Sequence, residues 1–192
     1  MKSTVLIAVL GCMLAGDALG QNLLANGNFD SNIYGWNHPD AYPSWKPLDA
    51  NGSMQSGSAY YANTQAAGAT RVNVLSQCVP TYDPGVYLMG ASGYIPTGQS
   101  NGDLVFSYSL FVPSNQCLGA PGASGTFSLS EFGAWQVFSN TSFPLNVSIQ
   151  RNTPASILLT LGVEKVNVGG SFAGYFDNIY LIRDTLFLDG FE

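Results

Sequence analysis

Few residues in this chain could perform catalysis. The segment Gly98–Gly102, with Ser100 at its centre, matches the G-x-S-x-G pattern of serine hydrolases. That pattern needs a strand before the serine, a helix after it and a histidine later in the chain. Here the single histidine, His38, precedes Ser100, and a strand-like alternation follows the motif. We therefore interpret the segment as a glycine- and asparagine-rich hairpin loop.

The acidic residues give no clearer sign of an active site. A glycoside hydrolase needs two carboxylates about 5–10 Å apart across a cleft. Glu131, Glu164 and the scattered aspartates show no recognisable acid–base pair in the sequence. The chain also has no phosphate-binding loop, dinucleotide fingerprint or zinc motif. We predict that the protein is not an enzyme. A small glycan-active hydrolase is less favoured than a non-catalytic role.

The composition narrows the choice of partner. The chain has 192 residues, of which 46% are hydrophobic and 9% are charged, with a net charge of −6. An average soluble domain carries about 25% charged residues, so the polarity here comes mainly from neutral side chains. The six basic residues are scattered, which excludes the clustered cations of a nucleic-acid surface. The hydrophobic content excludes a disordered chain.

The first twenty residues have the layout of a secretory signal peptide. Lys2 supplies the positive start, Ser3–Leu14 the apolar stretch, and Ala18-Leu19-Gly20 the small-residue cleavage site. The apolar stretch is too short to span a membrane. Lipoprotein processing at Cys12 is disfavoured because Leu10 fits that signal poorly. We expect a secreted protein with a signal peptide at 1–20, one domain at 21–183 and a tail at 184–192.

Removal of the signal peptide leaves two cysteines, Cys78 and Cys117. Two cysteines in an oxidising compartment most simply form one disulfide. Its closed loop of about 40 residues would stabilise the fold by roughly 4 kcal/mol on the chain-entropy estimate. A metal-binding or nucleophilic thiol would need a nearby histidine or a setting that lowers its pKa.

Several segments alternate with a period of two, which indicates strands with one buried face. The clearest are residues 104–112, 87–95, 157–163 and 175–182. Turn signals such as Asp83-Pro84-Gly85 and Gly169-Gly170 separate them. We predict eight to ten short strands, no amphipathic helix and one all-β domain, either a sandwich or a barrel.

Five motifs follow one another in the order found in a known family. The chain resembles galactose-binding-like β-sandwich domains, which include carbohydrate-binding modules of the cellulose- and xylan-binding type. The resemblance covers residues 22–183 and implies a jelly-roll sandwich with a sugar-binding role. The residues that carry it are Asn22–Asp30 followed by Gly35-Trp36, Ser56–Ala59, Ser76–Val79, Trp135, and Tyr175–Ile179.

The resemblance also implies roles for single residues. In such domains an acid near the first strand and the aspartate of the last strand help to hold a structural calcium ion, which prefers oxygen ligands. Here these residues are Asp30, where the family usually has glutamate, and Asp177. The other reading is that both carboxylates accept hydrogen bonds in turns. Apart from the resemblance, Phe29, Trp36 and Trp135 are large aromatic residues, and we expect them to pack into the core.

Sugar binding uses flat aromatic faces together with neutral hydrogen-bonding groups, and this composition supplies both. The best aromatic candidates are Tyr42, Trp45, Tyr60 and Tyr94. We expect a secreted, non-catalytic protein that binds a neutral glycan through an aromatic-lined face. The alternative is a structural or adhesive protein that uses the jelly roll for protein or cell-surface contacts. The apolar tail after Ile182 could provide a protein-binding segment.

Overall fold

The computed structural model describes residues 20–66, 70–81, 83, 85–99, 101–138, 145–149, 154–167 and 169–184. Cys12, Ser100, residues 1–19 of the predicted signal peptide and residues 185–192 of the predicted tail lie outside these ranges. Regular structure in the described part of the chain is entirely β. Among the described residues, no helix could span a membrane. The strands are β1 (Ser44–Lys46), β2 (Ser58–Asn63), β3 (Thr70–Thr81), β4 (Gly85–Tyr94), β5 (Gly102–Phe111), β6 (Ala123–Leu129), β7 (Trp135–Val137), β8 (Leu145–Ile149), β9 (Ala155–Lys165) and β10 (Phe172–Asp184).

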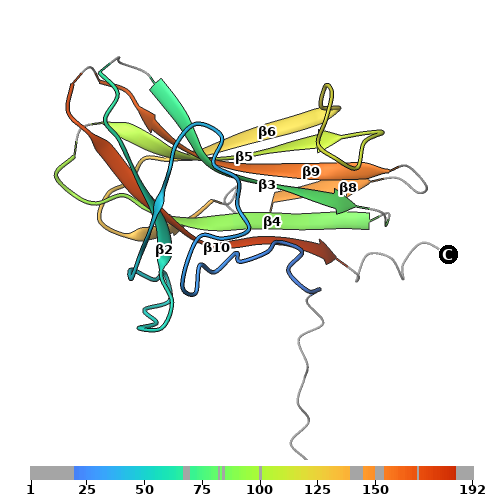
Figure 1. Cartoon of the computed structure of the whole chain (residues 1–192), viewed down its shortest axis with the longest axis horizontal. Helices are drawn as coiled ribbons and strands as arrows, with labels where there is room; N and C mark the ends of the chain where they lie inside the picture. The colour runs from blue at the N-terminus through green and yellow to red at the C-terminus, as the bar shows by residue number, and fades with distance from the viewer. Residues whose placement is uncertain are drawn as a thin grey trace, which may run out of the picture.

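The strands form two antiparallel sheets that pack face to face as a sandwich (Figure 1). Sheet A has the order β1-β2-β10-β4-β7, and β8 pairs with β4 beyond the end of β7. Sheet B has the order β3-β9-β5-β6. The four strands predicted from the alternating pattern correspond to β5, β4, β9 and β10. The all-β sandwich is therefore confirmed.

The core lies between the sheets, where every second side chain of each strand points inward. Leu104 and Phe106 of β5 meet Phe176 of β10 and Phe138 in this layer, and all four are buried. The ring of Phe138 bridges the sheets, because its centroid lies 5.8 Å from that of Phe106 and 6.2 Å from that of Phe176. These ring contacts fix the position of one sheet relative to the other.

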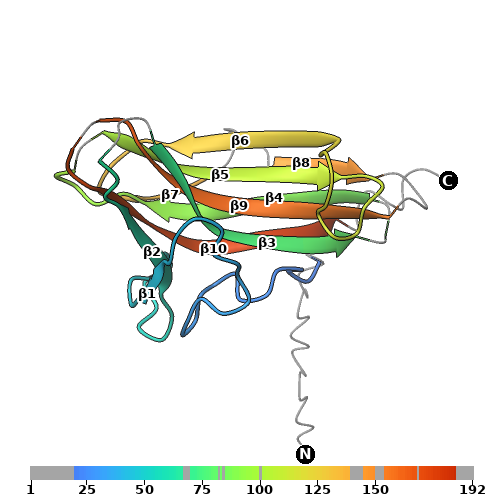
Figure 2. The same ribbon diagram turned by 45° about the horizontal axis from the view of Figure 1, so that its top comes forward.

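The segment before β1 connects the two sheets along one side of the sandwich. Asn22 pairs with Ile182 of β10 and Asn37 pairs with Ser76 of β3, and Figure 2 shows this blue segment beside β3 and β10. Phe29 and Trp36 are buried in it, as predicted, with their ring centroids 5.8 Å apart. Both side chains belong to the hydrophobic core of the sandwich.

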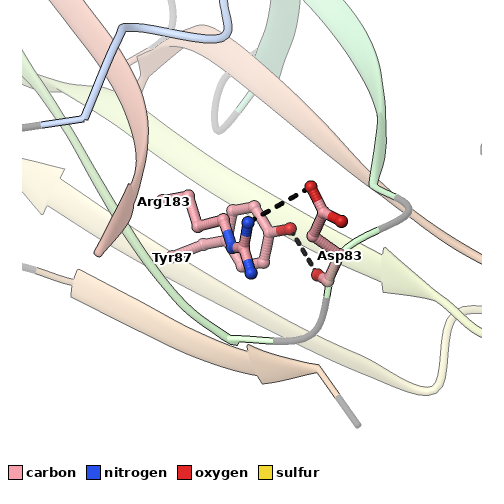
Figure 3. Close-up of polar contacts among 3 residues, drawn as sticks. All are labelled: Asp83, Tyr87 and Arg183. Atoms are coloured by element: carbon pink, nitrogen blue, oxygen red, sulfur yellow. Dashed lines mark hydrogen bonds and ion pairs between the residues drawn. The ribbon is translucent and has the colours of Figure 1, made fainter. Parts of the chain in front are cut away.

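Two further links fasten the ends of strands. The predicted disulfide is present and joins Cys78 of β3 to Cys117, in the loop that follows β5. In the turn between β3 and β4, Asp83 accepts a hydrogen bond at its carbonyl from the buried Tyr87 hydroxyl, at 2.6 Å. Its carboxylate pairs with Arg183 of β10 at 3.2 Å (Figure 3). These contacts fix the turn between β3 and β4 to the last strand.

Candidate functional site

A row of four aromatic side chains crosses the outer face of sheet A. Tyr60 of β2 is the register partner of Tyr175 of β10, and Tyr175 is the partner of Tyr94 of β4. Tyr94 in turn pairs with Trp135 of β7. Along this series the ring centroids are 4.8, 5.8 and 5.6 Å apart. We call these four residues the aromatic row.

The alternation of the strands places the aromatic row on the side away from the core. Ala59, Gly93 and Phe176 each adjoin a member of the row in sequence, and all three are buried. Successive residues of a strand point to opposite faces, so the row points outward. Its four side chains are half-buried, because each ring is flanked by its neighbours on adjacent strands. The row is therefore an accessible surface with little freedom of movement.

The backbone under the aromatic row rests directly on the core. A Cβ atom at Gly174 would lie 2.3 Å from Cδ2 of Leu104, and one at Gly93 would lie 2.9 Å from Cδ1 of Leu129. Contacts this short leave no room for a methyl group at either position. These glycines immediately precede Tyr175 and Tyr94 in the sequence. Close packing at the glycines therefore fixes the distance between the core and the backbone that carries the two central rings.

The environment of Tyr175, at the centre of the row, favours the neutral form of its phenol. Burial raises the pKa of the Tyr175 phenol, and the adjacent phenols of Tyr60 and Tyr94 raise it further. A neutral phenol can both donate and accept a hydrogen bond. Planes of neighbouring rings are inclined by 47°, 59° and 39°. The surface thus combines apolar ring faces with neutral hydroxyl groups.

One positive charge lies at the Tyr60 end of the row. Lys46 of β1 is exposed, and its Nζ lies 5.6 Å from the centroid of the Tyr60 ring. Ser44 is the register partner of Tyr60 and is exposed on the same face. Polar groups therefore border the aromatic surface at this edge of sheet A.

The structure brings together two of the four aromatic candidates from the sequence, Tyr60 and Tyr94. Trp45 does not join them, because it packs against the core and its Nε1 donates a hydrogen bond to the Phe29 carbonyl at 2.6 Å. Tyr42 is 89% exposed on a loop, where its ring contacts His38 at 6.1 Å between centroids. Neither residue forms part of the row.

Sequence reasoning missed the other two members. Trp135 was expected to pack into the core, and that expectation is wrong, since the residue pairs with Tyr94 on the outer face. Tyr175 was assigned only to a family motif. The signal that could have found it is the alternation in β10, where the buried Phe176 directly follows it.

The two predicted calcium ligands lie beside a loop that covers part of the same outer face. Asp177, the register partner of Ser92, is fully buried, and its two carboxylate oxygens accept hydrogen bonds from the amides of Ala50 and Asn178. Burial raises the pKa of Asp177 to about 6, against the opposing effect of these two bonds, and the nearby Asp49 and Asp30 raise it further. Three carboxylates therefore gather at this point.

The surroundings of these acids are rich in oxygen. The Ser56 hydroxyl donates to the Asn28 carbonyl at 3.0 Å and lies 3.4 Å from Oδ1 of Asp30. Asp49 accepts the amides of Asn51 and Ser53, each at 2.8 Å. Across the residues that the structure describes, no group of three or more His, Cys, Asp or Glu side chains converges closely enough to hold a metal ion. The donor types suit calcium, whereas the close convergence is not present.

Solved structures of other proteins share the β-sandwich fold of this chain. No protein-family model and no curated protein matches the sequence. Among solved structures, TmCBM61 in complex with β-1,4-galactotriose matches with a TM-score of 0.55 and 16% identity, covering 85% of this chain and 99% of that one. A putative sugar-binding protein from Bacteroides thetaiotaomicron matches with a TM-score of 0.53 and 15% identity, covering 85% and 100%.

The same fold also occurs inside larger proteins. The enzymatically active domain of tailspike protein 4 from bacteriophage CBA120 matches with a TM-score of 0.56 and 14% identity. That match covers 83% of this chain but 21% of the tailspike chain. At such identities the likeness concerns the fold alone. The chain has the β-sandwich fold found in carbohydrate-binding modules, in agreement with the resemblance of its sequence motifs.

Proposed function

We propose that this protein binds carbohydrate on the aromatic row, and that the glycan is largely neutral. The single observation that carries the proposal is the cross-strand register, which aligns Tyr60, Tyr175, Tyr94 and Trp135 on four neighbouring strands. Neighbouring strands are about 4.8 Å apart. An oligosaccharide lying across the strands would therefore meet one aromatic face on each strand. Neutral phenols would satisfy sugar hydroxyls between these apolar contacts.

We also propose that this binding is not accompanied by catalysis. The best-placed candidate for a general acid is Asp177, because its pKa of about 6 would keep it partly protonated near neutral pH. Its carboxylate is fully buried, however, and both oxygens already accept backbone amides. A substrate on the aromatic row would have no access to it. A glycan-active hydrolase is therefore the weaker reading.

Secretion is part of the proposal. The Cys78–Cys117 disulfide is of the kind that persists in oxidising compartments. A signal peptide over residues 1–20 would deliver the chain to such a compartment. Amino-terminal sequencing of the protein from culture medium would test both points, and a mature chain that begins at Gln21 is the expected result.

A structural calcium ion is a separate proposal. Asp30, Asp49 and Asp177 lie near one another, and no described cation forms an ion pair with any of them. Calcium binding would offset the repulsion between the three carboxylates. The ion would also hold the loop over Asp177 through oxygen ligands. Calorimetric titration of the chelator-treated protein is expected to show binding. Absence of heat at millimolar calcium would end the proposal.

The sugar-binding proposal is tested with purified, disulfide-bonded protein on an array of neutral oligosaccharides, with and without calcium. The dissociation constant of a bound oligosaccharide is then measured for wild type, Tyr94→Ala and Tyr34→Ala. Tyr34 is the control because its side chain is 79% exposed and lies outside the row. We expect Tyr94→Ala to weaken binding by about tenfold or more and Tyr34→Ala to bind like wild type.

Two results would overturn this proposal. One is the absence of any glycan binding by protein that melts cooperatively. The other is a bound glycan whose affinity is the same for wild type and for Tyr94→Ala. In the first case the alternative of protein or cell-surface contacts becomes the leading one. Val137 would then be a candidate protein-contact residue. It is exposed in β7 two residues after Trp135 and adds apolar surface to that end of the row.

A further inference from the structure

Most basic side chains that the structure describes are engaged by the protein itself. Arg183 pairs with the carboxylate of Asp83 at 3.2 Å. Lys165 is buried and donates to the carbonyls of Gln65 and Gly170. Arg71 of β3 donates to Oδ1 of Asn73 in its own strand at 3.1 Å and to Oγ of Ser107 in β5 at 2.8 Å. These three cations are used to hold the fold together.

Lys46 differs from them in both position and partners. It is exposed, and its Nζ is placed over the Tyr60 ring at the end of the aromatic row. Within the described ranges no carboxylate lies within 4.0 Å of this Nζ. Lys46 is therefore the described cation that remains available to a ligand, and it lies on the surface proposed to bind one.

The charge of the rest of the chain makes this position informative. With a net charge of −6, most of the surface repels an anionic polymer. A single cation at one end of a neutral aromatic surface can still attract one negative group held at that point. The arrangement suits a glycan that is neutral over most of its length and acidic at one position. It does not suit a polyanion.

Resting on the proposed sugar-binding function, we propose that the glycan carries one anionic group, which Lys46 binds at the Tyr60 end of the aromatic row. The carboxylate of a uronic acid and a sulfate ester share this chemistry, because both present oxygen atoms that accept hydrogen bonds from an ammonium group. Lys46 is thus the specificity-determining residue of the site. The tyrosines and Trp135 supply the contacts with uncharged sugar rings.

The test compares pairs of oligosaccharides that differ by one acidic group. Xylotetraose and glucuronosyl-xylotetraose form one such pair, and an array adds other neutral backbones with their uronate- and sulfate-bearing forms. The measured quantity is the ratio of the two dissociation constants within a pair. For wild type at low ionic strength we expect the acidic member to bind about three- to tenfold more tightly. The preference should shrink as salt is added.

Variants of Lys46 assign the preference to its charge. Lys46→Gln should reduce the ratio to about one, Lys46→Glu should invert it, and Lys46→Arg should retain it. Binding of neutral and acidic members with equal affinity in wild type would overturn the inference and leave the proposed function standing. A preference that persists in Lys46→Gln would also overturn it. If no member of any pair binds, the proposed function itself fails. A preference limited to uronates or to sulfates identifies which anion the site takes.

Discussion

Tyr60 and Tyr175 form the tightest ring pair of the aromatic row, with centroids 4.8 Å apart across β2 and β10. They lie far apart in the sequence and meet only because the two strands pair in a particular register. A shift of one residue would turn one of the two rings toward the core. The candidate binding surface is thus a product of strand pairing rather than of any local motif.

The first prediction concerns the centre of the row. Tyr175→Ala removes the ring between Tyr60 and Tyr94 and so interrupts the continuous aromatic surface. We expect the affinity for a bound oligosaccharide to fall by about tenfold or more. Tyr175→Phe keeps the ring and removes only the hydroxyl, so its affinity should fall about threefold or less. Calorimetric titration measures both, with a thermal melt to verify folding.

The two variants also separate stacking from hydrogen bonding. Equal losses for Tyr175→Phe and Tyr175→Ala would mean that the hydroxyl, and not the ring face, makes the contact. Unchanged affinity in both variants would remove Tyr175 from the binding surface.

The second prediction separates Trp45 from the binding surface. Trp45→Phe removes the hydrogen bond from Nε1 to the Phe29 carbonyl, which measures 2.6 Å. The unfolding free energy should fall by about 1–2 kcal/mol, which urea denaturation would reveal. Glycan affinity should stay at the wild-type value. Loss of affinity without loss of stability would instead restore Trp45 as a ligand-binding residue.

The third prediction concerns the support beneath the row. In Gly174→Ala the new methyl group would lie 2.3 Å from Cδ2 of Leu104, and the core must shift to admit it. We expect a loss of about 1–3 kcal/mol in unfolding free energy, measured by urea denaturation. Gly122→Ala is the matched control, because its nearest contact would be the Leu110 carbonyl oxygen at 3.9 Å. That control should be neutral within about 0.5 kcal/mol.

A second substitution checks the cause of the Gly174→Ala effect. If overpacking against Leu104 is responsible, the Gly174→Ala/Leu104→Ala double variant should lose less stability than the sum of the two single losses. Strict additivity would contradict this explanation.

The sequence predicted the fold well because the fold depends on local patterns. The sequence alone reveals the alternation in β5, without knowledge of the partner strand. It also reveals the two cysteines, Cys78 and Cys117, that form the disulfide. The site could be predicted only in part. Trp135 opens a three-residue strand, which is too short for a period to reveal which face its side chain occupies. The proximity of Asp49 to Asp177 depends on how a loop folds back over the last strand.

The last prediction uses the raised pKa of Asp177. Unfolding returns this carboxyl from a pKa of about 6 to its ordinary value of 3.8, so between these pH values the native state binds more protons than the unfolded state. In chelator-treated protein the stabilising contribution of this group is therefore complete below about pH 4 and is lost as the pH rises through 6. The loss approaches about 3 kcal/mol at neutral pH. The lowered pKa of Asp49 acts in the opposite sense, but only below its ordinary value of 3.8.

Urea denaturation between pH 4.5 and 7.5 measures this effect through its slope. Asp177→Asn should flatten the slope, although it also sacrifices one of the two amide hydrogen bonds that the carboxylate accepts. Asp40→Asn is the control, because Asp40 accepts hydrogen bonds from Asn73 and lies outside the acidic cluster. Millimolar calcium should restore stability at neutral pH if the ion binds these carboxylates, since the metal favours their ionised form. A slope that is unaffected by Asp177→Asn would contradict the assignment, because the proton uptake would then belong to another group.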